Sequence, residues 1–431
     1  MSNKKYLAIL QRGVQDWNNW KQNNLHIQPD LRGINLSSRV LIGIDFTGVN
    51  LAGANLVKSN FCGANLDGAN LIGTNFTEAN LSGASLTGAN LTGANLIRAN
   101  YRNAELIGAN LSLADLAFAD LRVIDFTAAD LSSANFTQAN LNGAVFVGAK
   151  LTRANFELAE LKKVDFTNAN LIQARLRQAD LTEAHLNKTD LTEADLTEAD
   201  LTKASLFKAD LTEADLTEAD LTKANLLKAD LTEACLTKAN LTTADLIWTN
   251  LARADLSQAN LTKANLTKAN LVKTKAWTTN FSQCILTGAC IENLQIDRQT
   301  CWEQVQCQYL YLKYYQKQRQ PQESSQSLQP DEFQGIINNL LGSVQLIFDS
   351  NIDWDIFLST FQDLQLQYKS QKIQIRSIES MMGRGFTIEI DIYPGVEISA
   401  IKKYFWHKYN LMAIARNNLE SDLACSPIGN Q

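Results

Sequence analysis

A five-residue period dominates this chain and limits what it can fold into. Every fifth residue from Leu31 to Ile296 is Leu, Phe, Tyr or Ile, and Ala276 is the one exception. Most of these residues follow Ala by two positions, with Asn or Asp between, so the unit reads A-(N/D)-(L/F)-x-x. The 54 units contain no insertion and cover well over half of the 431 residues. A repeat this strict predicts one continuous repetitive domain over residues 31–300.

Neither a helix nor a plain strand can use a period of five. In an α-helix five residues advance about 500°, so successive leucines would spiral around the axis. In a strand an odd period sends alternate leucines to opposite faces. A short extended piece followed by a turn fits the pattern, because Ala and Leu then point inward together. Glycine at the second position after Leu suits that turn, as at Gly53, Gly63, Gly68, Gly83, Gly88 and Gly93.

With these units, the segment resembles the pentapeptide-repeat family. The resemblance implies a right-handed, four-sided parallel β-helix with 20 residues in each coil, about 13 coils and a length of roughly 65 Å. Like residues should then recur every 20 positions, and Phe126, Phe146 and Phe166 do so, as do Phe136 and Phe156. The predicted fold class is mainly β, a quadrilateral β-helical solenoid with a small C-terminal α+β domain.

Charged residues at the second position after Leu form columns when the sequence is arranged in rows of 20. Between about residues 183 and 238 this predicts a basic side and an acidic side of the rod. One interpretation is recent duplication, which copies charges without selecting them; the other is a surface that docks an oppositely charged partner or a second rod. The candidate docking residues are Lys188, Lys208, Lys228, Lys268, Lys203, Lys223, Glu193, Glu213, Glu233, Glu198 and Glu218.

Both ends of an open solenoid need a cover, because exposed apolar edges aggregate. Residues 1–30 are predicted to form an N-terminal capping helix, because the apolar residues of this segment recur at the three- and four-residue spacing of a helix. Its capping residues are Leu10, Val14, Trp17 and Trp20, with an exposed aromatic docking face as the alternative. After Ile296, the helical spacing of Trp302, Val305, Tyr309 and Leu312 predicts a second capping helix. A Gln-rich linker completes residues 301–330.

The composition changes at about residue 331, where a separate α+β domain is predicted over residues 331–420 in the order ααββα. The first helix contains Phe333, Ile336, Ile337, Leu340, Leu341 and Val344 on one face. Asp353 is the expected cap of the second helix. Apolar and polar residues alternate over 372–378 and 386–393, which predicts two strands. Residues 396–409 are predicted to form the third helix.

Composition favours a protein of the cytosol. The net charge is −6, from 39 basic and 45 acidic residues, which argues against a general polyanion binder and against nucleic acid as a partner. No apolar run is long enough to span a membrane, and the apolar stretch near the start is too short for a secretory signal. Seven cysteines without a Cys-x-x-Cys motif do not predict a disulfide framework.

No catalytic, cofactor-binding or metal-binding residues are predicted. Cys284, Cys290, Cys301 and Cys307 lie close in sequence, but their spacing is unlike a zinc site, so core filling is the preferred interpretation. Aspartates recur every 20 residues before Leu, yet Asn fills the same position freely, which a metal ligand would not allow. We expect these Asn and Asp side chains to hydrogen-bond the backbone of the following turn.

Three functions follow as hypotheses. The first is a non-catalytic protein-interaction scaffold or regulator with an unidentified protein partner, a second copy of the chain being one option. In cyanobacterial proteins of the family, which this chain resembles, the implied roles are regulatory. The alternative is a DNA mimic that modulates an enzyme such as gyrase, although residues 31–296 carry 28 acidic and 23 basic residues. The third is an enzyme with its activity in the C-terminal domain, which no residue pattern supports.

Overall fold

The computed structural model describes residues 3–341, 343–348, 352–368, 373–380, 386–392 and 398–424. Contacts divide the chain into two units, which are described separately. The rod unit comprises Met1–Glu292 and Gln299–Ser327, and the C-terminal unit comprises Asn293–Arg298 and Leu328–Gln431. Among the described residues, no helix combines the length and the apolar character that crossing a membrane requires.

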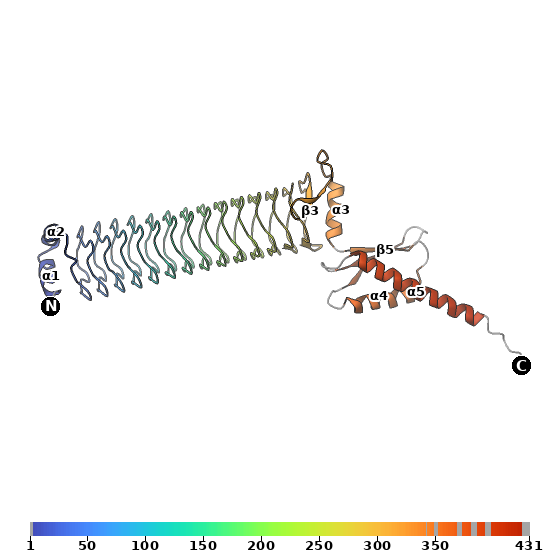
Figure 1. Ribbon diagram of the computed structural model, residues 1–431, viewed down its shortest axis with the longest axis horizontal. Helices are drawn as coiled ribbons and strands as arrows, with labels where there is room; N and C mark the ends of the chain where they lie inside the picture. Colours follow the sequence, from blue (N-terminus) through green and yellow to red (C-terminus); the bar gives the residue numbers. More distant parts are fainter. Residues whose placement is uncertain are drawn as a thin grey trace. The chain divides into compact units, whose positions relative to one another are not determined.

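The rod unit is a stack of similar coils (Figure 1). Residues 20 apart form parallel bridges, from Asp30 with Asn50 up to Asn270 with Cys290, so each coil contains four five-residue units. The Leu36 N–H donates to the Asn55 carbonyl of the next coil at 2.9 Å, and this contact recurs along the rod. The repeated Leu and Ala side chains are buried between the four sides. The repeat therefore folds as a β-helix-like rod.

Phenylalanine columns inside the rod confirm the spacing of 20 residues. The rings of Phe126 and Phe146 stack with centroids 4.9 Å apart, and those of Phe136 and Phe156 stack at 4.7 Å. Phe146 and Phe166 continue the first column at 4.9 Å. These separations match the distance of about 4.8 Å between hydrogen-bonded strands, so each ring lies directly above the equivalent ring of the previous coil.

The turns of the repeat have a left-handed backbone, as the glycines predict. Gly53 has φ of 67°, but residues with side chains adopt the same conformation in equivalent positions, for example Lys203 at 60° and Glu213 at 59°. The predicted hydrogen bond from Asn or Asp is confirmed as well. Asp210 Oδ1 accepts from the Thr212 N–H at 3.0 Å and from the Thr212 hydroxyl at 2.6 Å. Each acidic side chain of this kind is therefore occupied in holding a turn.

Two short helices, α1 (Asn3–Leu10) and α2 (Val14–Gln22), precede the first coil. The prediction of one capping helix is wrong in this respect, because Gly13 with φ of 115° separates them. Trp17 is fully buried and its ring edge contacts Phe46, with centroids 5.3 Å apart. Leu10 is buried, whereas Val14 and Trp20 are half-buried, and Trp20 packs on Trp17 at 5.3 Å.

The α2 helix supplies hydrogen bonds that a preceding coil would otherwise make. The Trp17 indole N–H donates to the Asp45 carbonyl at 2.7 Å, and the Asp45 N–H donates to Asn18 Oδ1 at 2.9 Å. Asn18 Nδ2 also donates to the Gly43 carbonyl at 2.9 Å. Two adjacent side chains of α2 thus satisfy both backbone groups of Asp45 on the first coil, which would otherwise be left unpaired.

Trp17→Ala should open the N-terminal coils. Removing a fully buried aromatic ring costs about 3–5 kcal/mol, and here it also leaves the Asp45 carbonyl without its donor. Because each coil contacts only its neighbours, hydrogen exchange should accelerate in residues 30–60 and stay unchanged near residues 240–290. Trp20→Ala is the matched control and should cost less, since Trp20 is half-buried. Equal acceleration along the whole rod would contradict this role.

The coils continue beyond Ile296 with a shift of one residue. Asn280 bridges Cys301 and Cys290 bridges Tyr311, both 21 residues apart, and the Trp302 ring stacks on Phe281 at 4.4 Å. The predicted capping helix through Trp302, Val305, Tyr309 and Leu312 is therefore wrong. The physical reason is that Trp302, Cys307 and Leu312 keep the five-residue period. The backbone of this segment therefore hydrogen-bonds to the previous coil and does not form a helix.

Four short strands lie near the end of the repeat, three of them in the rod unit and one in the Asn293–Arg298 segment of the C-terminal unit. They are β1 (Lys275–Ala276), β2 (Gln295–Ile296), β3 (Leu310–Lys313) and β4 (Lys317–Gln320). β3 and β4 pair antiparallel, with Leu310 opposite Gln320 and Lys313 opposite Lys317. This hairpin carries several of the tyrosines that the sequence places after the repeat.

A buried hydroxyl lies within the rod at Tyr101. Its side chain is 1% exposed, and the oxygen has no hydrogen-bond partner among the described residues. Burial raises the pKa of this phenol well above its usual value, so the group stays neutral. The hydroxyl is costly in this position because nothing replaces the hydrogen bonds that it makes to water in the unfolded chain.

Tyr101→Phe should stabilise the protein by about 1–3 kcal/mol, since it removes an unpaired buried hydroxyl and keeps the ring. Urea unfolding followed by circular dichroism measures the change. Phe136→Tyr provides the reverse control, because it introduces a hydroxyl into the stacked column and should destabilise. A stability loss for Tyr101→Phe would show that the hydroxyl has a partner in solution.

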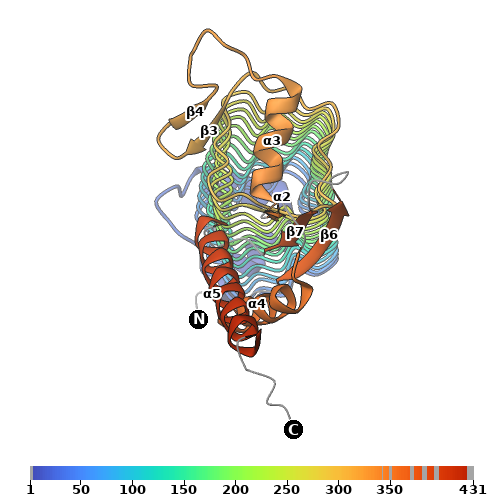
Figure 2. The same cartoon turned by 90° about the vertical axis from the view of Figure 1, so that its right-hand side faces the viewer.

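The C-terminal unit is an α+β structure. Its elements are α3 (Pro330–Leu340), β5 (Ser343–Phe348), α4 (Trp354–Gln367), β6 (Gln374–Ser380), β7 (Phe386–Asp391) and α5 (Ile398–Ala424). The three strands form an antiparallel sheet in the order β5-β7-β6, and α4 and α5 pack together (Figure 2). Phe357, Ile388 and Phe405 are fully buried in the shared core.

The predicted order ααββα omits one strand of this unit. The expected first helix ends at Leu340, and Ser343–Phe348, which includes Val344, forms β5 instead. The alternation of buried Leu346 and Phe348 with exposed Ile347 is the strand signal that the helical spacing obscured. The predicted cap of the second helix is confirmed, because the Asp353 side chain accepts from the N–H groups of Asp355 and Ile356.

Candidate functional site: a lysine face and an aromatic groove

The charged residues predicted as a docking surface lie at the outer corners of the rod. Each has a left-handed backbone, with φ of 57° at Lys208 and 60° at Lys228, and this conformation turns its side chain outward. Bridges between residues 20 apart place Lys188, Lys208 and Lys228 in successive coils, about 4.8 Å apart at the backbone. The predicted columns therefore exist as continuous edges of the molecule.

The acidic edges are largely paired within the rod. Glu218 binds Lys238 at 2.7 Å and Glu233 binds Arg253 at 2.7 Å, each pair joining adjacent coils. Glu193 accepts a hydrogen bond from the neutral Gln173 side chain, and three of the five predicted glutamates have ion pairs, Glu198 with Arg177, Glu218 with Lys238 and Glu233 with Arg253. The hydrogen bond from Gln178 is the main cause of the lowered pKa of Glu198. These carboxylates are partly neutralised before any partner arrives.

The lysine edges are mostly unpaired. Lys203 binds Glu183 at 3.2 Å, but Lys188, Lys208, Lys223 and Lys228 make no ion pair within the part of the chain that the structure describes. Lys208 instead places its ammonium 5.4 Å from the Phe207 ring centroid. Neighbouring like charges about 5 Å apart repel by roughly 1 kcal/mol in water before salt screening. These four lysines are therefore able to form ion pairs with an anionic partner.

Apolar side chains accompany the lysine corner, and sequence reasoning missed them. Phe207, Leu227 and Ile247 occupy the slot just before the corner in three successive coils, and all three are half-exposed. The corresponding slot elsewhere in these coils is mostly Thr. That departure from Thr was the available signal. We call this surface the lysine face, and its residues are Lys188, Lys208, Lys228, Lys203, Lys223, Phe207, Leu227 and Ile247.

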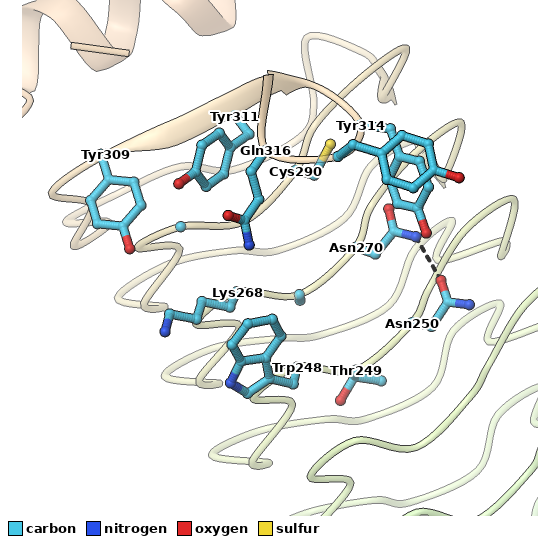
Figure 3. A pocket seen from close by; sticks show the side chains of 13 residues that line it. Trp248, Thr249, Asn250, Lys268, Asn270, Cys290, Tyr309, Tyr311, Tyr314 and Gln316 are labelled. Carbon is cyan, nitrogen blue, oxygen red and sulfur yellow. Dashed lines mark hydrogen bonds between the residues drawn. The ribbon is translucent and has the colours of Figure 1, made fainter. Parts of the chain in front are cut away.

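The same corner continues into a groove of about 460 Å³ at the far end of the rod (Figure 3). Trp248 follows Lys228 in the column, and Lys268 follows Trp248. We call the hollow the aromatic groove, and its principal lining residues are Trp248, Lys268, Gly288, Tyr309, Tyr311 and Tyr314. Of the predicted docking residues, Lys268 alone belongs to this groove and not to the lysine face.

Gly288 allows two lining side chains of the groove to approach its backbone closely. Its φ of 76° favours glycine, and an added Cβ would lie 3.0 Å from Lys268 Cγ and 3.1 Å from the Tyr309 hydroxyl. Every other residue of this corner from Lys188 to Lys268 has a side chain. The missing side chain at Gly288 thus lets Lys268 and Tyr309, which both line the groove, pack closely against its backbone.

Cys284 and Cys307, near this end of the rod, are poor nucleophiles. Burial raises the pKa of the Cys307 thiol to about 12, and it raises that of the fully buried Cys284 still further. Cys284 fills an inward alanine position, as expected. Across the described ranges, no group of three or more His, Cys, Asp or Glu side chains is placed to hold a metal ion.

Comparison with family models now identifies the repeat. The model described as "Pentapeptide repeats (8 copies)" matches residues 30–68, 57–93, 89–127, 199–238, 209–246 and 239–275. The model described as "Pentapeptide repeat region" matches residues 119–196. The chain belongs to the pentapeptide-repeat family. The matched ranges of this pentapeptide-repeat protein include the whole lysine face.

Several solved structures of pentapeptide-repeat proteins are similar to this one. HetL from the cyanobacterium Nostoc sp. strain PCC 7120, described as involved in heterocyst differentiation regulation, is 30% identical over 59% of this chain and 93% of its own, with a TM-score of 0.37. QnrB1, a plasmid-mediated fluoroquinolone resistance protein, is 16% identical over 45% and 92%, with a TM-score of 0.28. The Nostoc protein alr5209 is 34% identical over 22% and 84%, with a TM-score of 0.21. No curated protein matches the chain.

Proposed function

We propose that this pentapeptide-repeat protein is a non-catalytic interaction scaffold or regulator whose lysine face binds an acidic surface of another protein. The asymmetry of the two charged sides is the observation that carries the proposal. Three of the five predicted glutamates, Glu198, Glu218 and Glu233, have ion pairs in the rod, whereas Lys188, Lys208, Lys223 and Lys228 have none among the described residues. Duplication alone accounts for columns of like charge, but it does not account for this difference.

The lysine face has the two components that protein interfaces use. Its lysines would steer an acidic partner and gain from relief of their mutual repulsion. Phe207, Leu227 and Ile247 would supply the apolar contacts from which most of the affinity arises, since exposed ion pairs by themselves contribute little. The rod holds both sets in fixed positions, so no ordering of the backbone opposes binding.

The other hypotheses have less support. A DNA mimic needs a long uninterrupted acidic face, but Lys238 and Arg253 interrupt the glutamate columns and pair with them. An enzyme needs an activated side chain, and burial raises the pKa of the Cys284 and Cys307 thiols, which keeps them protonated. The free cysteines are consistent with the cytosol, which we include in the proposal.

Lys208→Glu should weaken binding of an acidic probe. A dye-labelled polyglutamate peptide, followed by fluorescence polarisation, should bind the full-length wild type at low salt and progressively less as salt is added. The substitution should weaken binding by roughly three- to tenfold, because it replaces an attraction with a repulsion. Lys208→Glu with Lys228→Glu should weaken it further.

Lys273→Glu is the matched control. Lys273 occupies an equivalent corner with φ of 57°, lies on another side of the rod and makes no ion pair within the described ranges. The two substitutions change the net charge equally, so their difference reports position alone. Equal weakening by both would show that only overall charge matters, and the lysine face would not be a docking site.

A further inference from the structure

We propose that the aromatic groove binds a proline-rich segment of a partner protein in the extended polyproline conformation, with acidic residues flanking the prolines. The inference extends the proposed function by naming a second site and a different chemistry. It shares with that function only the expectation of an acidic flank, because the groove and the lysine face occupy neighbouring parts of one corner column.

The groove is made by departures from the repeat. The corner position is Lys at 188, 208, 228 and 268, but it is Trp at 248 and Gly at 288. The Trp248 side chain is 46% exposed, and its backbone has φ of 59°. Lysine occupies this position in the coils on either side, so the coil backbone does not require the indole.

The aromatic rings form a notch and not a flat platform. The rings of Tyr309 and Tyr311 lie 5.7 Å apart at 82°, so the face of one meets the edge of the other. Lys268 Nζ lies 4.7 Å from the Trp248 ring centroid, and Arg319 lies 4.4 Å from that of Tyr309. Figure 3 shows Trp248 and Lys268 on one side of the hollow and the tyrosines on the other. A compact ring such as that of proline fits between faces arranged in this way.

Polar groups at the tips of these rings match a polyproline backbone. A polyproline helix has no internal hydrogen bonds, so its carbonyls are free to accept from a binding surface. The Trp248 indole N–H and the hydroxyls of Tyr311 and Tyr314 have no hydrogen-bond partner among the described residues. Grooves lined by aromatic residues with such donors are the usual receptors for proline-rich segments.

Other ligands suit the groove less well. Its described lining contains no Leu, Ile, Val or Phe, which an amphipathic helix would need as a receptor for its apolar side chains. A sugar ring stacks on an open aromatic face, but cations already lie over the Trp248 and Tyr309 rings. A proline ring is smaller than a hexose and packs in the notch between the Tyr309 and Tyr311 rings.

The lysines around the groove determine which charge the residues next to the prolines of the ligand should have. Lys268 lies on the rim of the groove, and Lys228 lies one coil away from Trp248 along the same corner. Lys313 and Lys317 face each other across the hairpin that carries the tyrosines. Carboxylates next to the prolines would meet these cations, whereas basic residues would be repelled.

The test uses the full chain and a dye-labelled peptide of three glutamates followed by six prolines. Fluorescence polarisation should detect saturable binding to the wild type. Trp248→Lys restores the corner residue of the neighbouring coils, so the fold should persist, which circular dichroism checks. This variant should bind the peptide about tenfold more weakly or worse, as expected for loss of a central aromatic contact.

Two controls isolate the groove. Trp277→Thr removes another exposed tryptophan of the rod and introduces the residue usual in that slot, so binding should change by less than about twofold. A peptide in which alternating glycine and serine replace the prolines should bind the wild type about tenfold more weakly.

The outcomes separate the two proposals. Equal affinity of Trp248→Lys and wild type would overturn the groove proposal, and so would equal binding of the glycine–serine peptide, since carboxylates alone would then suffice. Binding of cellohexaose without binding of the proline peptide would also overturn it and identify a carbohydrate site. None of these results affects the lysine face, whose own failure appears as equal effects of Lys208→Glu and Lys273→Glu.

Discussion

The hydrogen-bond ladder between successive coils is the interaction on which the rest of this structure depends. Leu36 donates upward to Asn55 at 2.9 Å, and Asn55 donates downward to Ile34 at 2.8 Å, so every unit relies on both neighbouring coils. The ladder remains in register only if all coils have the same length, which explains why the repeat tolerates no insertion before Ile296. A single added residue then changes the spacing of the bridges from 20 to 21.

The ladder also determines how a surface can be built. Because every fifth residue lies at a corner with a left-handed backbone, its side chain points outward, directly above the residue 20 positions earlier. The corner residue 20 positions away, in the adjacent coil, therefore decides whether a charged side chain is available to a partner. Glu218 meets Lys238 and is neutralised, whereas Lys208 lies between Lys188 and Lys228 and is not. The docking surface is a property of the stacking and not of any local motif.

Short periodicities made much of the fold predictable. The five-residue period and the recurrence of phenylalanine every 20 residues were enough for the coils, and Asp353 was enough for its helix start. Segments whose apolar residues fit both a helix and another structure were not predictable. Trp302 and Leu312 fit a helix as well as a coil, and the ladder decided for the coil. Val344 suited a helical face but lies in β5, where cross-strand pairing with Ile390 decides.

The candidate site was harder to predict than the fold because it depends on contacts between residues distant in sequence. The lysine columns could be located by arithmetic, but the pairing of the glutamates depends on side-chain reach between coils. The aromatic groove combines Trp248, Gly288 and Tyr309, which come together only through stacking and the one-residue shift. No short motif contains all three residues.

The two ends of the rod differ in a way that separates folding from function. At the first coil, Trp17 and Asn18 pair with the backbone of Asp45, so each departure from the repeat completes the ladder. At the other end, the backbone N–H of Trp248 donates to the next coil as that of Lys228 does, so the ladder does not require an indole at this position. A residue that the ladder does not require, exposed beside a hollow, is best explained by what it binds.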